Sequence, residues 1–263
     1  MRALMMAAAL ALAGAGMTFP TRAAESPDAG TQATLREAEA RGLQLFRHDR
    51  AISVAKAAFD DVRRFRRDRR VRGQVSETRG ERVQVSFYGA NDGGPVAVLY
   101  RVLVEADGRV SGGVQALAAP TALTAHESMA IRALDIAGQQ AFPSCARSYR
   151  LVALPESLGA DRWSVYLLAE SDDEDVLPLG GSFRIDIDLS RQRRALQSFS
   201  QSCDGLDNGD NVFALLVNNA LAATPSEIHV YWQHWSGKPM YLTHSDRSLL
   251  WLLEEGRISQ VAR

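Results

Sequence analysis

The stretch VQVSFYGANDGGPVAVLYRVLV at residues 83–104 decides the fold class of this chain. Its first five residues alternate between apolar and polar, and a period of two is typical of a half-buried strand. The GGP run at 93–95 then breaks the chain, and the apolar run at 96–104 predicts a second strand. Asp107-Gly108 is a hairpin turn signal that leads into a further strand. The sequence therefore predicts an antiparallel meander here.

Helical spacing precedes this meander. Thr34 followed by Glu37 is a capping-box pattern and predicts the start of a helix. Asp49 can cap a second helix, whose apolar residues follow one face as far as Val62. We therefore expect a first unit of helices plus antiparallel sheet over residues 24–122.

The same order of elements follows a second time. Thr124 and Glu127 form another capping box, and the helix is expected to continue until Pro143. Four strands are predicted after it, at 149–154, 163–169, 182–189 and 195–199. Similar triplets, Tyr100-Arg101-Val102 and Phe183-Arg184-Ile185, occupy similar places in the two halves. An internal duplication and chance similarity are equally compatible with this pattern.

The C-terminal segment is expected to consist of β hairpins. Strands are predicted at 212–217, 226–235, 240–243 and 249–253, with turn sequences between them. Helices segregated from antiparallel meanders give the α+β class, here as tandem helix-plus-meander units followed by an all-β region. The predicted organisation is a leader at 1–23, units at 24–122 and 123–205, and hairpins at 206–263 packed with the preceding unit.

Composition excludes several classes of protein. The chain has 263 residues, of which 46% are hydrophobic and 23% charged, and its formal net charge is −1. These values are typical of a globular protein and exclude collagen-like, coiled-coil, low-complexity and multi-span membrane chains. A near-zero net charge also argues against a global polycation that binds nucleic acid.

The N-terminus has the pattern of a secretory signal peptide. Met1-Arg2 is a short basic start, an apolar run extends over 3–19, and small residues follow up to Ala23-Ala24. An anchoring transmembrane helix is the alternative, but it would require a longer apolar run. We expect cleavage near Ala23 or Ala24, export to the periplasm or the medium, and no transmembrane span in the mature chain.

Two cysteines, Cys145 and Cys203, are the only thiols of the chain. In an oxidising compartment a single pair is most simply a structural disulfide. A redox-active pair would instead be expected to have C-x-x-C spacing within a thioredoxin-like pattern, and that spacing is absent.

Several motifs carry a resemblance to known proteins: LFRHDRA (45–51), WSVYLLA (163–169), LGGSFR (179–184), SQSC (200–203) and TPSEIHV (224–230). They resemble a family of exported proteobacterial proteins with no established activity, over most of the mature chain. A helix on a four-stranded meander is also similar to cystatin-like and PepSY-type modules, which often bind or inhibit proteins. The second likeness is architectural and implies a binding role only by analogy.

The sharpest local feature is a basic run of seven arginines within ten residues: Arg63, Arg64, Arg66, Arg67, Arg69, Arg70 and Arg72. Guanidinium groups bind phosphates and carboxylates bidentately, so this run is a possible anion-binding site. In an exported protein the partner would be a lipid headgroup, lipopolysaccharide or an acidic protein. The alternative is a solvated helix end, where cations suit the dipole.

Metal sites are weakly indicated. The acidic loops at 172–175 and 204–210 could offer oxygens to calcium, but they do not follow the EF-hand order, and turn chemistry explains them as well. His229 and His234 are five residues apart on a predicted strand and would face opposite sides. His48, His126 and His244 have no companion at ligand spacing and are expected at the surface or in helix caps. We expect no cofactor and no metal.

Function is the least constrained property. No nucleophile elbow and no P-loop are present. A possible ligand face comprises Glu227, His229 and Tyr231, although aromatic side chains here also suit core packing. We expect a non-enzymatic binding module for a protein, peptide or anionic envelope component, with no nucleic acid among its partners. The alternative is an envelope hydrolase with an Asp/Glu/His site around His229 and Glu227.

Overall fold

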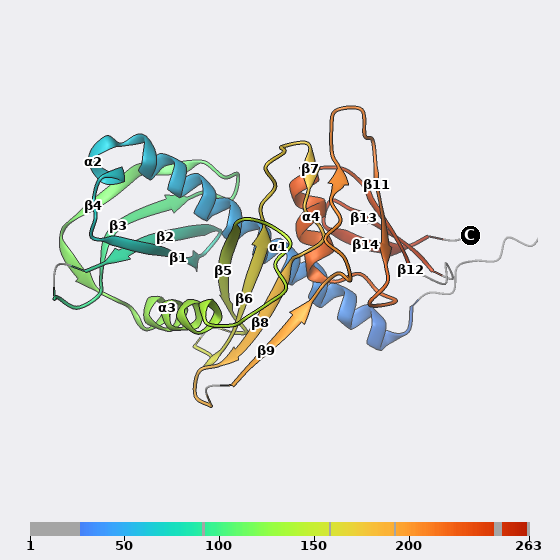
Figure 1. Cartoon of the computed structure of the whole chain (residues 1–263), viewed down its shortest axis with the longest axis horizontal. Coiled ribbons are helices and arrows are strands. Elements are labelled where there is room, and N and C mark those ends of the chain that lie inside the picture. Colours follow the sequence, from blue (N-terminus) through green and yellow to red (C-terminus); the bar gives the residue numbers. More distant parts are fainter. Residues whose placement is uncertain (1–26, 91–92, 158, 192, 245–248, 262–263) are drawn as a thin grey trace, which may run out of the picture.

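Three four-stranded sheets are arranged along one long helix (Figure 1). This computed structural model describes residues 27–90, 93–157, 159–191, 193–244 and 249–261, so the predicted leader lies outside the described residues. Within these ranges no helix combines the length and the hydropathy that a membrane span requires. Helices on antiparallel meanders confirm the predicted α+β class.

The long helix is α1 (Ala29–Asp61), which begins at the N-cap Asp28, whose carboxylate accepts from the Thr31 amide at 3.0 Å. The prediction of two helices starting at Thr34 and Asp49 is wrong. Asp49 lies in the middle of a continuous helix and is fully buried, because its carboxylate binds side chains from other elements instead of capping an amide.

The first sheet follows a single helical turn, α2 (Arg63–Arg66). Its strands are β1 (Val71–Arg79), β2 (Arg82–Gly89), β3 (Ala97–Val104) and β4 (Val110–Ala122), antiparallel and in sequential order. The predicted meander is thus confirmed. The C-terminal half of α1 covers this sheet, and the ring of Phe59 stacks on that of Phe87 with centroids 4.4 Å apart.

The second sheet contains β5 (Tyr149–Pro155), β6 (Arg162–Ala169), β8 (Phe183–Asp188) and β9 (Arg193–Ser198), in that order. Helix α3 (Ala125–Gly138) packs on one face and starts with the predicted capping box, in which Glu127 N donates to Thr124 Oγ1 at 3.1 Å. It ends at Gly138, before the predicted stop at Pro143. The short strands β7 (Val176–Leu177) and β10 (Leu206–Asp207) pair separately.

The third sheet consists of β11 (Leu215–Asn219), β12 (Met240–His244), β13 (Leu250–Glu254) and β14 (Arg257–Gln260). The strand predicted at 226–235 is wrong, because α4 (Glu227–Ser236) occupies it. The reason is topological: β11 and β12 are parallel, and parallel neighbours require a crossover, which this helix supplies. Gly237, with a φ of +66°, ends the helix.

Each of the two helix-plus-meander units has an ion pair at a corresponding place. Arg101 lies on the third strand of the first sheet and approaches Glu127, in the first turn of the next helix, at 3.6 Å. Arg184 lies on the third strand of the second sheet and binds Glu227, in the first turn of α4. The predicted similarity of the triplets at 100–102 and 183–185 therefore extends to their partners, although duplication itself stays a prediction.

The predicted disulfide between Cys145 and Cys203 is present, with Cα atoms 5.3 Å apart. It joins the loop after α3 to the loop after β9. Gly181, with a φ of +83°, lies against this bridge, and a Cβ at that position would approach Cys145 Cβ to 2.4 Å. Only glycine therefore fits at the entrance to β8.

Candidate functional site

A cleft of about 660 Å³ lies between the N-terminal half of α1 and the second sheet. The helix contributes Glu37, Ala40, Arg41 and Gln44 to its wall, and the strands contribute Arg162, Ser164, Arg184, Asp186, Asp188 and Ala195. The cleft exists because the two faces of the second sheet are covered to different extents. One face packs on α3, and the other is covered only in part by α1 and α4, so the uncovered part becomes the floor of the cleft.

The floor is polar because side chains alternate between the two faces of each strand, and the polar ones lie on the face that forms the floor. On β8, Phe183, Ile185 and Ile187 are buried toward α3, while Arg184 and Asp186 are half-exposed on the opposite face. Cross-strand register puts Ser164 beside Asp186 on this face. A sheet face with alternating charge is suited to a hydrated, polar ligand.

Arg184 is the central cation of the floor, and its hydrogen-bonding capacity is largely used within the protein. It donates to Glu227, to Asp186 Oδ2 at 3.1 Å from Nη2, and to Gln197 Oε1 at 2.6 Å. Ser164 Oγ donates to the other oxygen of Asp186 at 2.8 Å. The two carboxylates are thereby held as acceptors in fixed positions.

Arg41 joins the wall of α1 to the floor. Its Nε donates to Tyr166 OH at 3.1 Å and its Nη1 to the carbonyl of Pro155 at 2.9 Å. Tyr166 OH in turn donates to Glu227 Oε1 at 3.3 Å. Burial, followed by the nearby charge of Glu227, raises the pKa of Tyr166 to about 12, so the phenol stays protonated at neutral pH. The walls are therefore rigidly cross-linked.

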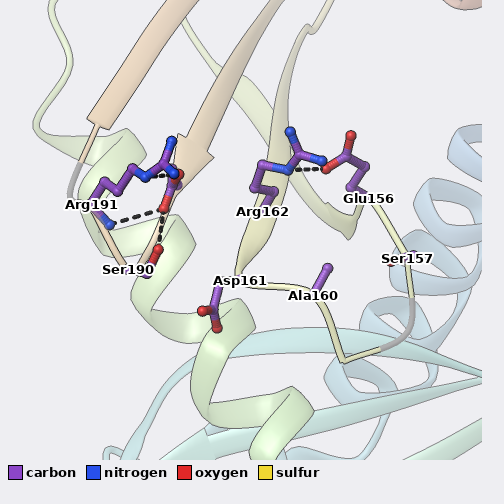
Figure 2. Close-up of a pocket in the computed structure, with 8 residues that line it drawn as sticks. Glu156, Ser157, Ala160, Asp161, Arg162, Ser190 and Arg191 are labelled. Atoms are coloured by element: carbon purple, nitrogen blue, oxygen red, sulfur yellow. Dashed lines mark hydrogen bonds and ion pairs between the residues drawn. The ribbon is translucent and has the colours of Figure 1, made fainter.

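A second hollow of about 530 Å³ adjoins the cleft at the end of the sheet (Figure 2). The pair Arg162–Glu156, 2.5 Å between Nε and Oε2, lines both cavities. On the opposite side, Ser190 Oγ and the amide of Arg191 donate to Asp188, and these bonds lower the pKa of that carboxyl. Here too the charges are paired.

Deeper in the molecule, Asp49 holds three elements together. Arg150 of β5 donates to both carboxylate oxygens, at 2.9 and 3.2 Å. From α4, Tyr231 OH donates at 2.8 Å and Trp235 Nε1 at 3.1 Å. Burial, then the charge of Asp49, raises the pKa of Tyr231 well above its usual value. This network joins α1, β5 and α4.

The three residues of the predicted ligand face are buried. Glu227 is bound by Arg184 and Tyr166, and Tyr231 belongs to the Asp49 network. His229 takes part in the N-terminal capping box of α4, in which Ser226 N donates to its Nδ1 at 3.1 Å. None of the three lines the cleft or the adjoining hollow. Burial lowers the pKa of His229 to about 4, so its ring is neutral.

His48 is buried, contrary to its expected place at the surface. Its Nδ1 lies 2.8 Å from Ser76 Oγ and its Nε2 2.9 Å from Thr78 Oγ1, so it bridges α1 and β1. Burial lowers its pKa to about 3. Only contacts distant in sequence could have identified this pairing. The same holds for Arg41, which belongs to no sequence motif, and for Arg184, whose motif LGGSFR (179–184) does not indicate its partners.

The arginine run is at the far end of the molecule, at α2 and the start of β1 (Figure 1). All seven arginines of this run are exposed to solvent. For the metal question, no group of three or more His, Cys, Asp or Glu side chains in the described residues could hold an ion. The acidic loops instead make turn-type bonds, such as Gly209 N to Asp207 Oδ1 at 2.9 Å.

Comparisons with known proteins identify no family. No protein-family model matches the sequence, and no curated protein matches it significantly. Among solved structures, the C-terminal domain of YpeB from Bacillus megaterium matches with a TM-score of 0.21 and 14% identity. The match covers 56% of this chain and 66% of that domain, just under two thirds. At this TM-score the match carries no argument about fold or function, and the expected PepSY-type likeness stays a prediction.

Proposed function

We propose that this chain is an exported, non-enzymatic binding protein that holds an extended polypeptide segment of a partner in the cleft between α1 and the second sheet. The main support for this proposal is that an edge strand borders the cleft. Its floor ends at β9, which is the last strand of its sheet and has a neighbour, β8, on one side only. An extended peptide can pair with such a strand and direct alternate side chains into the adjoining cleft.

The charge of the cleft suits a polypeptide. Arg41, Arg184 and Asp186 give the walls both signs of charge, and each already has internal partners. A strongly anionic ligand would have to compete with those carboxylates. A peptide backbone, which offers amides and carbonyls, requires no unpaired charge. Glu37 on the wall of α1 is exposed and has no ion-pair partner among the described residues, so it remains available to a basic side chain.

Two further observations support binding over hydrolysis. The ring of His229 is engaged by Ser226 and does not line the cleft, and Glu227 is engaged by Arg184 and Tyr166. A general base must reach the proton that it removes. The disulfide supports export, since such bonds persist in oxidising compartments. The periplasm is the location that the sequence of the predicted leader favours.

Site-specific photocrosslinking in cells tests this proposal. A benzophenone amino acid replaces Ala40 on the wall of the cleft, or Ala195 on its floor, and replaces Ala57 as a control on an exposed part of the same helix. We expect adducts from Ala40 and Ala195 to map to one stretch of one partner, and none of them from Ala57. The same adducts at all three positions, or no adduct at the two cleft positions, would contradict a cleft that binds a polypeptide.

A further inference from the structure

The arginine run forms an exposed cap on the end of the molecule that is remote from the third sheet (Figure 1). We call it the arginine cap: Arg63, Arg64, Arg66, Arg67, Arg69, Arg70 and Arg72, all exposed. Helix α1 separates it from the N-terminal end of the chain's described part by 33 residues, about 50 Å at 1.5 Å per residue. None of its members lines the cleft or the adjoining hollow.

One buried ring fixes the conformation of the cap. Phe65 is the only inward-pointing residue of α2, is 5% exposed, and packs on Phe59 and Tyr100 with centroids at 5.8 and 4.8 Å. The other three residues of this turn are arginines. With the single apolar residue in the core, the helical turn must present its guanidinium groups to solvent.

Most of the positive charge of the cap is not neutralised by acids in the described part of the chain. Asp68, the one acid inside it, accepts from Arg70 Nη2 at 2.6 Å and from Tyr100 OH at 2.6 Å, and Arg70 holds the pKa of that carboxyl below its usual range. Among the described residues, no carboxylate lies within 4.0 Å of the other six arginines. Asp60, just before the cap, is paired with Lys56.

Most exposed arginines elsewhere on the surface have a different environment. Arg79, Arg82, Arg109 and Arg147 each form an ion pair with a nearby acid. Arg162, Arg191 and Arg257 do so as well. Most exposed arginines outside the cap are thus paired with an acid. Arg36, Arg50, Arg132 and Arg194 have no ion pair among the described residues, but they are scattered along the chain, whereas the cap gathers six such arginines within ten residues.

We propose that the arginine cap docks the protein on an anionic lipid bilayer. An exposed turn with several guanidinium groups offers a broad positive surface, which fits many phosphates in one plane better than a single bound phosphate. The chain's net charge of −1 disfavours a long polyanion that would follow the body of the protein, such as duplex DNA. Contact with a planar surface requires positive charge only at the end that touches it.

This docking would orient the whole molecule. With the cap on the bilayer, α1 points away from the lipid surface, and the cleft near its other half faces the surrounding solution. The inference stands on the cap alone and does not depend on what the cleft binds.

Vesicle flotation with the purified chain tests the proposal. Vesicles of phosphatidylcholine mixed with phosphatidylglycerol are compared with phosphatidylcholine alone, at low and high salt. The variant replaces Arg63, Arg66, Arg67 and Arg69 by Gln, and none of these four side chains forms a hydrogen bond or ion pair with another described residue. Near an anionic surface each basic residue contributes about fivefold in affinity, so we expect more than about a hundredfold weaker binding. Binding of the native chain should be confined to anionic vesicles and decrease with salt.

A matched control separates the cap from net charge. Replacing Arg79, Arg82, Arg109 and Arg147 by Gln changes the net charge equally, but at hairpins and a loop remote from α2. This control should bind within about threefold of the native chain if the contact is local. An equal loss in both variants, or no loss in the cap variant, would overturn the proposal. So would displacement by millimolar glycerol phosphate, or equally tight binding to duplex DNA lost in the same cap variant.

Discussion

Arginines of the interior and arginines of the cap have opposite surroundings in the same molecule. Arg41, Arg150 and Arg184 are held between elements by carboxylates, a phenol and backbone carbonyls. The cap arginines are exposed and, Arg70 apart, have no carboxylate partner within the described residues. A guanidinium that is surrounded by internal acceptors fixes the positions of helices and strands. One without them contributes little to the fold and keeps its charge for contacts outside the chain.

The largest expected effect is at Asp49, the acceptor of the interior network. Asp49→Ala removes the acceptor of Tyr231 and Trp235 and leaves half-buried Arg150 with only Glu170, at 3.4 Å, as an acidic partner, so the unfolding free energy should fall by about 3 kcal/mol. Urea unfolding followed by fluorescence measures it. The double variant Asp49→Leu with Arg150→Met removes both charges and should recover part of the loss. A single variant within 1 kcal/mol of the native chain, roughly the effect of a neutral hydrogen bond, would show that the network does not hold the elements together.

A smaller effect is expected at Glu227, because Arg184 keeps Asp186 and Gln197 as partners. Glu227→Gln should lower the unfolding free energy by about 2 kcal/mol, the typical cost of a lost charged hydrogen bond. Glu127→Gln, which affects the corresponding pair with Arg101, is the matched variant. Similar costs would agree with equivalent roles in the two units, and a negligible cost at both positions would contradict a structural role for these pairs.

The interior should also respond to pH, whereas the cap should not, because arginines remain protonated throughout. Burial lowers the pKa of His48 to about 3 and that of His229 to about 4, while an unfolded histidine titrates near 6.5. Between about pH 6.5 and 4 the unfolded chain binds protons that the folded chain does not, so stability falls as pH falls. Each histidine adds about 1.4 kcal/mol per pH unit to this slope.

The measurement is the unfolding free energy at a series of pH values. His48→Gln, which can still bond to Ser76 or Thr78, should reduce the slope near pH 5 by about 1.4 kcal/mol per pH unit. An unchanged slope would mean that the folded protein already accepts this proton. Above about pH 7 the two proteins should show parallel behaviour, since the imidazole is neutral in both states.

Local patterns predicted much of the fold. The capping box at Thr124 and Glu127, the alternation from Val83 and the turn at Asp107-Gly108 depend on neighbours in sequence, and all three are present in the structure. The disulfide followed from there being one pair of cysteines. Such features depend on residues a few positions apart, which sequence inspection compares directly.

The incorrect predictions concern residues whose structural role is determined by partners distant in sequence. Asp49 fits an N-cap pattern, and only Arg150, 101 residues later, reveals it as a buried acceptor. The segment 226–235 is rich in aromatic and β-branched residues, which favour strands, but it is buried as a crossover helix. Ser226 and Gly237 at its ends were the available helix signals. The cleft had no sequence signal, because its walls and floor come from α1, β6, β8 and β9, which are far apart in sequence.

The comparison between the two sets of arginines is tested most directly by urea unfolding of two variants side by side. One is Arg150→Gln, and the other replaces Arg63, Arg66, Arg67 and Arg69 by Gln together. We expect the single interior change to lower the unfolding free energy by about 3 kcal/mol or more, since it leaves Asp49 buried without its cation. The four changes in the cap should lower it by less than about 0.5 kcal/mol in total. A cap variant that loses as much stability as Arg150→Gln would contradict the account.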